Sequence, residues 1–236
     1  MIPVDCDRLA AVVLDVDGTL YRQDVVRRGM LLRLLRAHAA RPAEGLRTVR
    51  ALRAYRRAQE HIRRAPEAYA DAAAGQVRLA CEWTGLDAAA VGACVERWME
   101  REPLDLVRQG TRDGVTDFLA DGARRGVRLA VLSDYPPRAK LAVMGIADFF
   151  QVIVCAQDAD VRAFKPDPRG IEVALARLGV ERGRALYVGD RPEVDAAAAA
   201  RAGVPCVIIG RRDAVHPGGW IEVSGFRRLR TLLFPS

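Results

Sequence analysis

Hydrophobic residues follow two different patterns along the chain, and these predict two kinds of structure. Residues 12–14 form a short apolar run rich in β-branched side chains, typical of a strand buried on both faces of a parallel sheet. Similar apolar runs follow at 127–132, 149–156, 185–188 and 204–209, the last being the expected final strand. Helical periodicity lies between or after them, at 113–125, 137–144, 168–178, 193–202 and 226–233. This alternation predicts one parallel sheet with crossover helices.

A long block without strand signals separates the first strand from the others. Leu, Met, Val and Ala recur there every three or four residues among many Arg, which predicts four amphipathic helices, at 25–40, 46–64, 68–83 and 87–100. Trp83 and Trp98 are expected to pack the core of this block. The expected architecture is therefore an α/β, Rossmann-like parallel sheet flanked by helices, with an all-helical cap inserted after the first strand. Residues 1–21 and 110–236 would form the core, and 22–109 the cap, lying over the site as a lid.

Two carboxylates follow the first strand directly. Asp15 and Asp17 are separated by one residue, so on an extended backbone their side chains leave the same face. Two like charges so close are tolerated if a cation lies between them or if one carries a proton. Gly18 then permits a tight turn. A strand that merely ends in an Asp-Gly turn is the alternative interpretation of this segment alone.

Other polar residues follow the later strands. Because ligands of open α/β sheets bind beyond the carboxyl ends of the strands, these residues are candidates for one site. They are Ser133 and Asp134 after 127–132, Lys165 in the loop after 149–156, and Asp190 and Asp195 after 185–188. Carboxylates gathered without His or Cys favour a hard cation, Mg²⁺ above others. A cation, a hydroxyl and an ammonium together would clamp a phosphoryl group.

Length and composition favour a protein that folds alone and does not span a membrane. The chain has 236 residues, of which 50% are hydrophobic and 28% charged. No apolar run approaches the roughly 18 residues that a membrane helix needs. The first residues carry acids and lack a basic leader with a cleavage site, so we expect a cytoplasmic protein. Five widely spaced cysteines with no Cys-x-x-Cys pair favour buried thiols over disulfides or zinc ligands.

Positive charge is concentrated in the helical block. Residues 22–69 contain thirteen Arg against four acids, a net charge of +9, whereas the whole chain carries +7. Such a region suits an anionic substrate or a nucleic acid, or is simply a solvated helical face. Lysine is rare, since only Lys140 and Lys165 occur beside 35 Arg. A Lys at 165 therefore marks a place where a compact ammonium matters, whereas no role is evident for Lys140.

Four short motifs occur in order along the chain: DVDGTL at 15–20, LSD at 132–134, FKPDP at 164–168 and GDRPEVD at 189–195. In this order and spacing they resemble the four motifs of the haloacid dehalogenase-like (HAD) hydrolase superfamily. The resemblance covers most of the chain. The helical cap between the first and second motifs resembles that of the phosphatase branch, and of phosphoglycolate phosphatase-like members in particular.

The resemblance implies a two-step phosphoryl transfer. Asp15 would attack phosphorus to form an aspartyl-phosphate. Asp17 would protonate the leaving alkoxide and then deprotonate the water that hydrolyses the intermediate.

The remaining motif residues would hold the metal and the phosphoryl group. Mg²⁺ would bind Asp15, the backbone carbonyl of Asp17 and Asp190, with Asp195 either binding the metal directly or supporting the residues that bind it. Ser133 and Lys165 would bind the phosphoryl oxygens. Asp134 stands where the family often has Asn, and it is a candidate contact to the phosphate or to water.

Within the superfamily, the motifs favour Mg²⁺-dependent hydrolysis of a small phosphorylated metabolite. Asp17 argues against the dehalogenase branch, which lacks the second acid. The cap contains no Lys, which argues against the phosphonate-cleaving branch, and no membrane spans support the pump branch. A phosphomutase acting on a sugar phosphate stays open, because it would use the same core residues.

A binding or regulatory module that uses its Arg-rich cap is a second class of function, but it has no need of clustered carboxylates. The cap Arg residues would suit a substrate with a second anionic group, such as a carboxylate or another phosphate. Nucleic acid is disfavoured as a partner, and both a monomer and a homodimer stay open.

Overall fold

The computed structural model describes residues 8–235. Residues 1–7 and Ser236 lie outside the described residues. They include Cys6 and most of the N-terminal segment whose sequence argues against a leader peptide.

A seven-stranded sheet in the order β3-β2-β1-β4-β5-β7-β6 forms the centre of the molecule. β1 (Ala11–Leu14) lies between β2 (Arg128–Ser133) and β4 (Ala185–Gly189) and is parallel to both. β3 (Val152–Cys155) and β5 (Cys206–Ile209) extend the parallel sheet on either side. The expected α/β fold with a mostly parallel sheet is confirmed.

The run at 204–209 is not the last strand, so that expectation was wrong. β7 (Trp220–Val223) pairs with β5 in parallel, and β6 (Ala214–Val215) pairs with β7 in antiparallel orientation at the edge of the sheet. Only alternate residues of β7 are buried, in contrast to the fully buried central strands. A strand of only four residues behind two glycines resembles a turn, which is why the pattern did not predict β7.

Helices cover both faces of the sheet, because successive side chains of a strand point to opposite sides. Val12 and Leu14 pack toward α6 (Val115–Arg124), α7 (Arg138–Val143) and α10 (Phe226–Leu233). Ala11 and Val13 pack toward α8 (Arg169–Leu178) and α9 (Ala197–Ala202). Short turns complete the layer: a π-helical turn at Pro192–Ala196 and 3₁₀ turns at Ala147–Phe149 and Arg182–Arg184.

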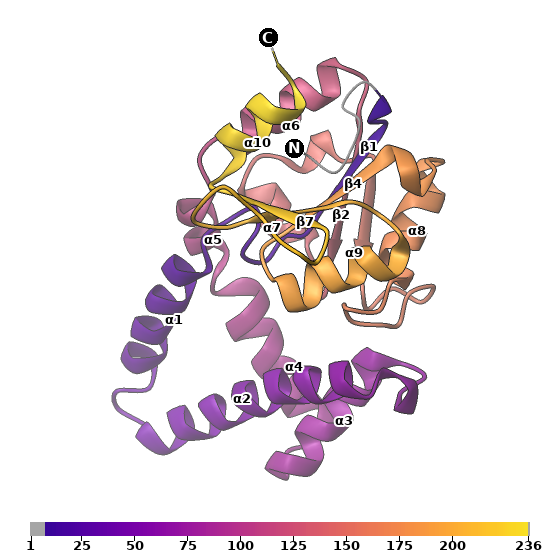
Figure 1. The fold of residues 1–236 in the computed structure, drawn as a ribbon. Helices are drawn as coiled ribbons and strands as arrows, with labels where there is room; N and C mark the ends of the chain where they lie inside the picture. Colours follow the sequence, from indigo (N-terminus) through magenta and orange to yellow (C-terminus); the bar gives the residue numbers. More distant parts are fainter. Residues whose placement is uncertain (1–7, 236) are drawn as a thin grey trace.

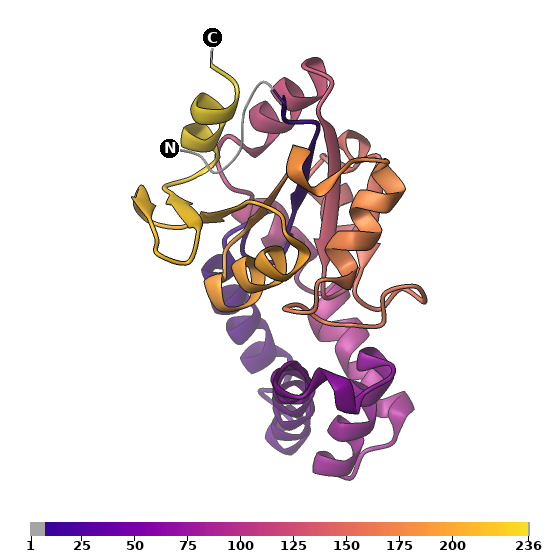
Figure 2. The same ribbon diagram turned by 45° about the vertical axis from the view of Figure 1, so that its right-hand side comes forward.

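The remaining helices form a separate lobe beyond the carboxyl end of β1 (Figures 1 and 2). They are α1 (Gln23–Ala37), α2 (Pro42–Arg64), a 3₁₀ turn (Pro66–Ala68), α3 (Ala72–Thr84), α4 (Ala88–Val95) and a π-helical segment (Glu96–Arg101). A further helix, α5 (Leu104–Gly110), leads back to the sheet. The pattern did not predict α5, because seven residues after a proline give too few turns for a recognisable periodicity.

The chain enters and leaves this lobe at one place. Tyr21 and Thr111 form an antiparallel bridge, the Arg22 N–H donates to the Gly110 carbonyl over 2.8 Å, and the Arg112 N–H donates to the Leu20 carbonyl over 2.9 Å. We propose this crossing as the boundary between the core and the cap, in keeping with the expected range of 22–109.

The two tryptophans of the lobe differ in their environment. Trp98 is 6% exposed and packs with Met30, Leu52 and Leu106, as expected of a core residue. Trp83 is 39% exposed, so it packs less than expected and instead lies beneath the Arg57 guanidinium.

Two findings concern membranes and thiols. No helix in the described part of the chain is both long and apolar enough to cross a membrane. Cys81, Cys94, Cys155 and Cys206 are all free thiols.

Candidate active site

The carboxyl end of β1 places two aspartates at the junction of the sheet and the helical lobe. The Asp15 N–H donates to the Val188 carbonyl of β4 over 2.8 Å, which continues the strand pairing up to the site. Asp15 itself is 4% exposed, and its Oδ2 accepts a hydrogen bond of 2.9 Å from the Thr19 hydroxyl. Gly18 turns the chain away with a φ of 107°, a value that side chains rarely adopt.

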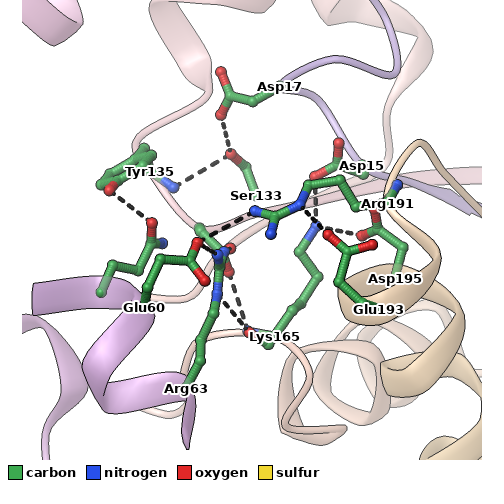
Figure 3. Close-up of polar contacts among 12 residues, drawn as sticks. Asp15, Asp17, Glu60, Arg63, Ser133, Tyr135, Lys165, Arg191, Glu193 and Asp195 are labelled. Atoms are coloured by element: carbon green, nitrogen blue, oxygen red, sulfur yellow. Dashed lines mark hydrogen bonds and ion pairs between the residues drawn. The ribbon is translucent and has the colours of Figure 1, made fainter. Parts of the chain in front are cut away.

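Lys165 lies in the middle of a carboxylate cluster, as Figure 3 shows. Its Nζ is 2.5 Å from Asp15 Oδ1, 2.7 Å from Asp195 Oδ1 and 3.2 Å from the Tyr187 hydroxyl. All four side chains are buried, so these charge-assisted hydrogen bonds are shielded from water. The loop that follows β3 therefore places Lys165 directly against Asp15 at the end of β1.

Burial and mutual repulsion shape the ionisation of the cluster. Burial raises the pKa of Asp15 well above its ordinary value; Lys165 opposes this rise, and the neighbouring Asp195 and Asp190 add to it. Burial likewise favours a raised pKa for Asp195, but the charge and hydrogen bond of Lys165 outweigh it and lower the pKa. One ammonium thus compensates only part of the negative charge.

Asp190 adds a third carboxylate to this group. Burial raises the pKa of Asp190 to about 6, with a further contribution from Asp195. One carboxylate oxygen from each of Asp15, Asp190 and Asp195 lies within 4.8 Å of the others. An all-carboxylate donor set in which the pKa values of Asp15 and Asp190 are raised fits a hard divalent cation, because the cation would offset the repulsion.

The two oxygens of Asp195 are already engaged. Oδ1 binds Lys165 and accepts from the Tyr187 hydroxyl, and Oδ2 accepts the backbone N–H groups of Asp190 and Arg191 at 3.1 and 3.0 Å. Asp195 therefore orients Lys165 and the turn at residues 190–191. Because both of its oxygens are already hydrogen-bonded, a role in supporting the metal ligands is favoured over direct metal binding.

Asp17 has a separate set of partners. Lys140 Nζ lies 2.5 Å from its Oδ1, which also accepts from the Tyr21 hydroxyl, and the Ser133 hydroxyl donates to its Oδ2 over 3.1 Å. Burial favours a raised pKa for Asp17, but the charge of Lys140 and these hydrogen bonds outweigh it, and the pKa is lowered. Its backbone carbonyl, a predicted metal ligand, accepts a hydrogen bond of 2.9 Å from the Gln23 amide.

Asp134 contacts the helical lobe. Its Oδ2 pairs with the Arg63 guanidinium at 2.5 Å, and its Oδ1 accepts the Lys165 N–H at 3.2 Å. The carboxylate is therefore an acceptor between two donors. This arrangement argues against its use as a contact to an anionic phosphate.

A cavity of about 500 Å³ connects these aspartates to the helical lobe. Its lobe-side wall combines apolar residues with cations, the latter including Arg27, Arg53 and Arg56. The apolar lining comes mainly from α1, α2 and the π-helical segment: Val26, Met30, Leu34, Leu52, Trp98 and Met99. The site thus has an acidic end at the aspartates and a partly apolar end, with arginines, at the helical lobe.

Comparison with known proteins establishes the family. A family model described as haloacid dehalogenase-like hydrolase matches residues 9–203, most of the chain. The chain belongs to the HAD-like hydrolases. The fold agrees, since a HAD phosphatase from Thermococcus onnurineus superposes with a TM-score of 0.60 at 21% identity over 96% of this chain and 98% of that one.

Two curated relatives of this HAD hydrolase are phosphatases. A phosphoglycolate phosphatase of Pectobacterium atrosepticum is 31% identical over 64% of this chain and 71% of its own length. A phosphoserine phosphatase of Thermus thermophilus is 38% identical over 40% of this chain. The match spans only 38% of the Thermus protein.

The HAD motifs account for Asp15, Asp17, Ser133 and Lys165, but other site residues were missed. Lys140, Tyr21 and Arg63 were not predicted to lie at the site. The rarity of lysine was a usable signal for Lys140, because both lysines of the chain prove to bind site carboxylates. Arg63 offered no signal, since it is one of thirteen Arg between residues 22 and 69.

Proposed function

We propose that this HAD hydrolase is a Mg²⁺-dependent phosphomonoester hydrolase that works through an aspartyl-phosphate on Asp15. The observation that carries the proposal is the pairing of Lys165 with Asp15 at 2.5 Å, beside a second aspartate, Asp17, with its own cation. A nucleophilic carboxylate with an ammonium at its side can both attack phosphorus and offset the charge of the phosphoryl oxygens.

In the first half-reaction, an Asp15 carboxylate oxygen forms a bond to phosphorus and the bond from phosphorus to the ester oxygen breaks. Lys165 and Ser133 donate hydrogen bonds to the phosphoryl oxygens. Asp17 gives a proton to the leaving alkoxide. Because the pKa of Asp17 is lowered in the free protein, Asp17 must first take up a proton from solvent, and the incoming phosphoryl anion favours this uptake by raising that pKa.

In the second half-reaction, a water oxygen bonds to phosphorus and the bond to Asp15 breaks. Asp17, now a carboxylate beside Lys140, takes the proton from that water. Tyr21 continues to hold Oδ1 of Asp17 between the two steps, while the Ser133 hydroxyl, which donates to Oδ2 in the free protein, is turned to the phosphoryl group.

Mg²⁺ fits the carboxylates at the end of the sheet. Asp15 and Asp190 would hold it together with the Asp17 backbone carbonyl, and Asp195 would support them through Lys165 and the 190–191 turn. When bound, the cation supplies charge neutralisation at the phosphoryl oxygens.

We further propose that the substrate carries a second anionic group on a body larger than a two-carbon acid. Phosphoglycolate and phosphoserine, the compounds that give the two relatives their names, each combine a phosphate with a carboxylate. Arg53 and Arg56 line the cavity one helical turn apart, with no ion-pair partner in the described part of the chain. A volume of about 500 Å³ falls in the range of sites that enclose a drug-sized ligand.

The experiment is a panel of phosphomonoesters assayed with and without Mg²⁺, beginning with an aryl phosphate. We expect release of inorganic phosphate by the wild type, dependence on Mg²⁺, and no turnover by Asp15→Asn. Peptide mapping of the quenched enzyme should place a phosphoryl group on Asp15. Transfer of the phosphoryl group between sugar hydroxyls without net release would instead identify a mutase. No turnover on any phosphate, together with binding of a macromolecule, would refute the enzymatic proposal.

A further inference from the structure

Arg63 of α2 reaches across from the helical lobe to two site residues of the core. Its Nε donates to the Lys165 carbonyl over 2.9 Å, and its Nη2 pairs with Asp134 Oδ2 at 2.5 Å. The Arg63 and Asp134 side chains are 8% and 9% exposed. A charged pair so well removed from water holds its geometry firmly, because loss of either partner leaves a buried charge.

Asp134 completes a closed set of contacts around Lys165. The Lys165 N–H donates to Asp134 Oδ1 over 3.2 Å, while the Lys165 carbonyl accepts from Arg63. The backbone of the lysine is therefore held on both sides, and its Nζ extends to Asp15. Figure 3 shows the Arg63 side chain beside the backbone end of Lys165, with Asp15 at the Nζ end of the lysine.

This arrangement explains an acid at position 134. Both neighbours of the side chain, the Arg63 guanidinium and the Lys165 N–H, are donors. A carboxylate accepts from both at once, whereas an amide would present N–H groups to one of them. An aspartate at position 134 is therefore explained by the Arg63 guanidinium, which the lobe places next to it.

Two further contacts join the same stretch of α2 to the core. The Tyr135 hydroxyl, next to Asp134 in the chain, donates to Gln59 Oε1 over 2.9 Å. Arg191, next to Asp190, lies 3.4 Å from Glu60 Oε1, and Glu60 also pairs with Arg63. One segment of α2, residues 59–63, thus contacts three core segments that carry site residues.

We propose that Arg63 is a positioning residue that couples the seating of the helical lobe on the core to the placement of Lys165. When the lobe is seated, Arg63 and Asp134 fix the lysine backbone and thereby aim Nζ at the Asp15 carboxylate. When the lobe withdraws, the two contacts of Arg63 are lost together, so the Lys165 carbonyl loses its donor and Asp134 is no longer fixed against the Lys165 N–H. The proposal rests on the proposed function in one respect, since it takes Lys165 as a ligand of the transferring phosphoryl group.

Arg63 also lines the cavity, so a direct substrate contact is the rival role. The two roles differ in kinetics. A residue that places Lys165 affects the transition state of every substrate and lowers kcat, whereas a residue that binds the far end of a substrate changes KM only for substrates with an anionic tail.

The experiment compares Arg63→Gln with Arg64→Gln, a neighbouring and exposed arginine without an ion pair in the described part of the chain. With a tail-less aryl phosphate, we expect Arg63→Gln to lower kcat by about 100-fold, with KM near the wild-type value, and Arg64→Gln to match the wild type. Arg63→Lys keeps the positive charge but cannot contact both Asp134 and the Lys165 carbonyl, so its kcat should lie between those of the wild type and Arg63→Gln. This variant also provides the test if Arg63→Gln does not fold.

Two further measurements make the test sharp. In a double-mutant cycle of Arg63→Gln with Asp134→Asn, kcat of the double variant should be only slightly lower than kcat of the more damaged single variant, because both residues act through Lys165. Amide hydrogen exchange at Lys165 should be faster in Arg63→Gln than in Arg64→Gln, and this readout needs no turnover. A wild type without phosphatase activity would therefore refute the proposed function while exchange still tested the coupling.

Three results would overturn the proposal. The first is equal Lys165 exchange in the Arg63 and Arg64 variants. The second is an Arg63→Gln effect on KM alone, restricted to acid-tailed substrates. The third is additive losses from Arg63→Gln and Asp134→Asn.

Discussion

Lys140 Nζ lies 2.5 Å from Asp17 Oδ1, just as Lys165 Nζ lies 2.5 Å from Asp15 Oδ1, so each of the two lysines of the chain pairs with one of the two aspartates that follow β1. The two pairs differ in their effect. The pKa of Asp15 is raised, because burial and three nearby carboxylates outweigh Lys165, whereas the pKa of Asp17 is lowered by Lys140 despite burial. Asp17 is thus kept as a carboxylate that can accept a proton.

Removal of Lys140 is expected to destabilise the fold. Its side chain is 6% exposed and that of Asp17 is 20% exposed, so Lys140→Met would leave a largely buried carboxylate without its cation. We expect a loss of about 3 kcal/mol in the free energy of unfolding at pH 7, measured by urea denaturation. Lys140→Met/Asp17→Asn, which leaves no unpaired charge, should recover most of the loss.

The Lys140→Met defect should depend on pH. In the wild type the folded pKa of Asp17 lies below its unfolded value, so the stabilisation is complete above the unfolded pKa and is lost as pH falls through the folded one. In the variant, burial prevails and raises that pKa, so Asp17 takes up a proton in mildly acidic solution. The difference in unfolding free energy between the wild type and Lys140→Met should therefore be largest near pH 7 and become smaller toward pH 4. A difference that does not change with pH would argue against charge as its cause.

Asp190→Asn should stabilise the metal-free protein while it weakens Mg²⁺ binding. The folded pKa of Asp190 is raised to about 6, so its charge costs stability above that pH, and the cost disappears as pH falls through it. We expect a higher Tm for the variant than for the wild type in EDTA at pH 7.5, and equal values near pH 4.

Mg²⁺ should reverse this order. It should raise the Tm of the wild type and not that of Asp190→Asn, because only the wild type retains the full set of ligands. Competition with protons should weaken the wild-type shift as pH falls below about 6. An equal Mg²⁺ shift in both proteins would place the cation elsewhere.

Gly18→Ala should disrupt the site beyond its cost in backbone strain. Gly18 has a φ of 107°, and a Cβ there would lie 2.2 Å from Asp190 Oδ2. Gly85 also has a positive φ, 73°, but no atom lies within 4 Å of its Cβ position, so Gly85→Ala reports strain alone. Both variants should lose on the order of 1 kcal/mol in unfolding free energy from strain, and only Gly18→Ala should also require more Mg²⁺ for activity. Identical Mg²⁺ titrations would contradict the close approach of Asp190.

Arg53 and Arg56 are expected to bind the anionic tail of the substrate. Arg53→Gln and Arg56→Gln should each raise KM for acid-tailed phosphates by about 10-fold and leave an aryl phosphate unaffected, because the reacting groups are unchanged. Arg57→Gln is the matched control, since Arg57 lies on the same helix but faces Trp83. Equal KM changes for tailed and tail-less substrates, or in the Arg57 control, would remove the case for a second anionic group.

Most of the core could be predicted from the sequence, because its signals are local. Continuous apolar runs mark strands buried on both faces, and a helix between successive runs implies parallel pairing. The carboxyl ends of parallel strands lie at one edge of a sheet, so Asp15, Ser133 and Asp190 could be expected near one another. The structure adds that the Lys165 ammonium lies between two of the carboxylates, at 2.5 and 2.7 Å.

The sequence by itself determined the parallel core, the acidic edge and the class of chemistry, since apolar periodicity and motif order are properties of short segments. Only the tertiary structure decided that Lys140 serves Asp17 from 123 residues away and that Arg63 serves Asp134 from 71 residues away. The lowered pKa of Asp17, the role of Asp134 as an acceptor for Arg63, and the shape of the cavity depend on how α7 and α2 pack against the edge of the sheet. Such packing is set by the summed contacts of many side chains, which no single stretch of sequence contains.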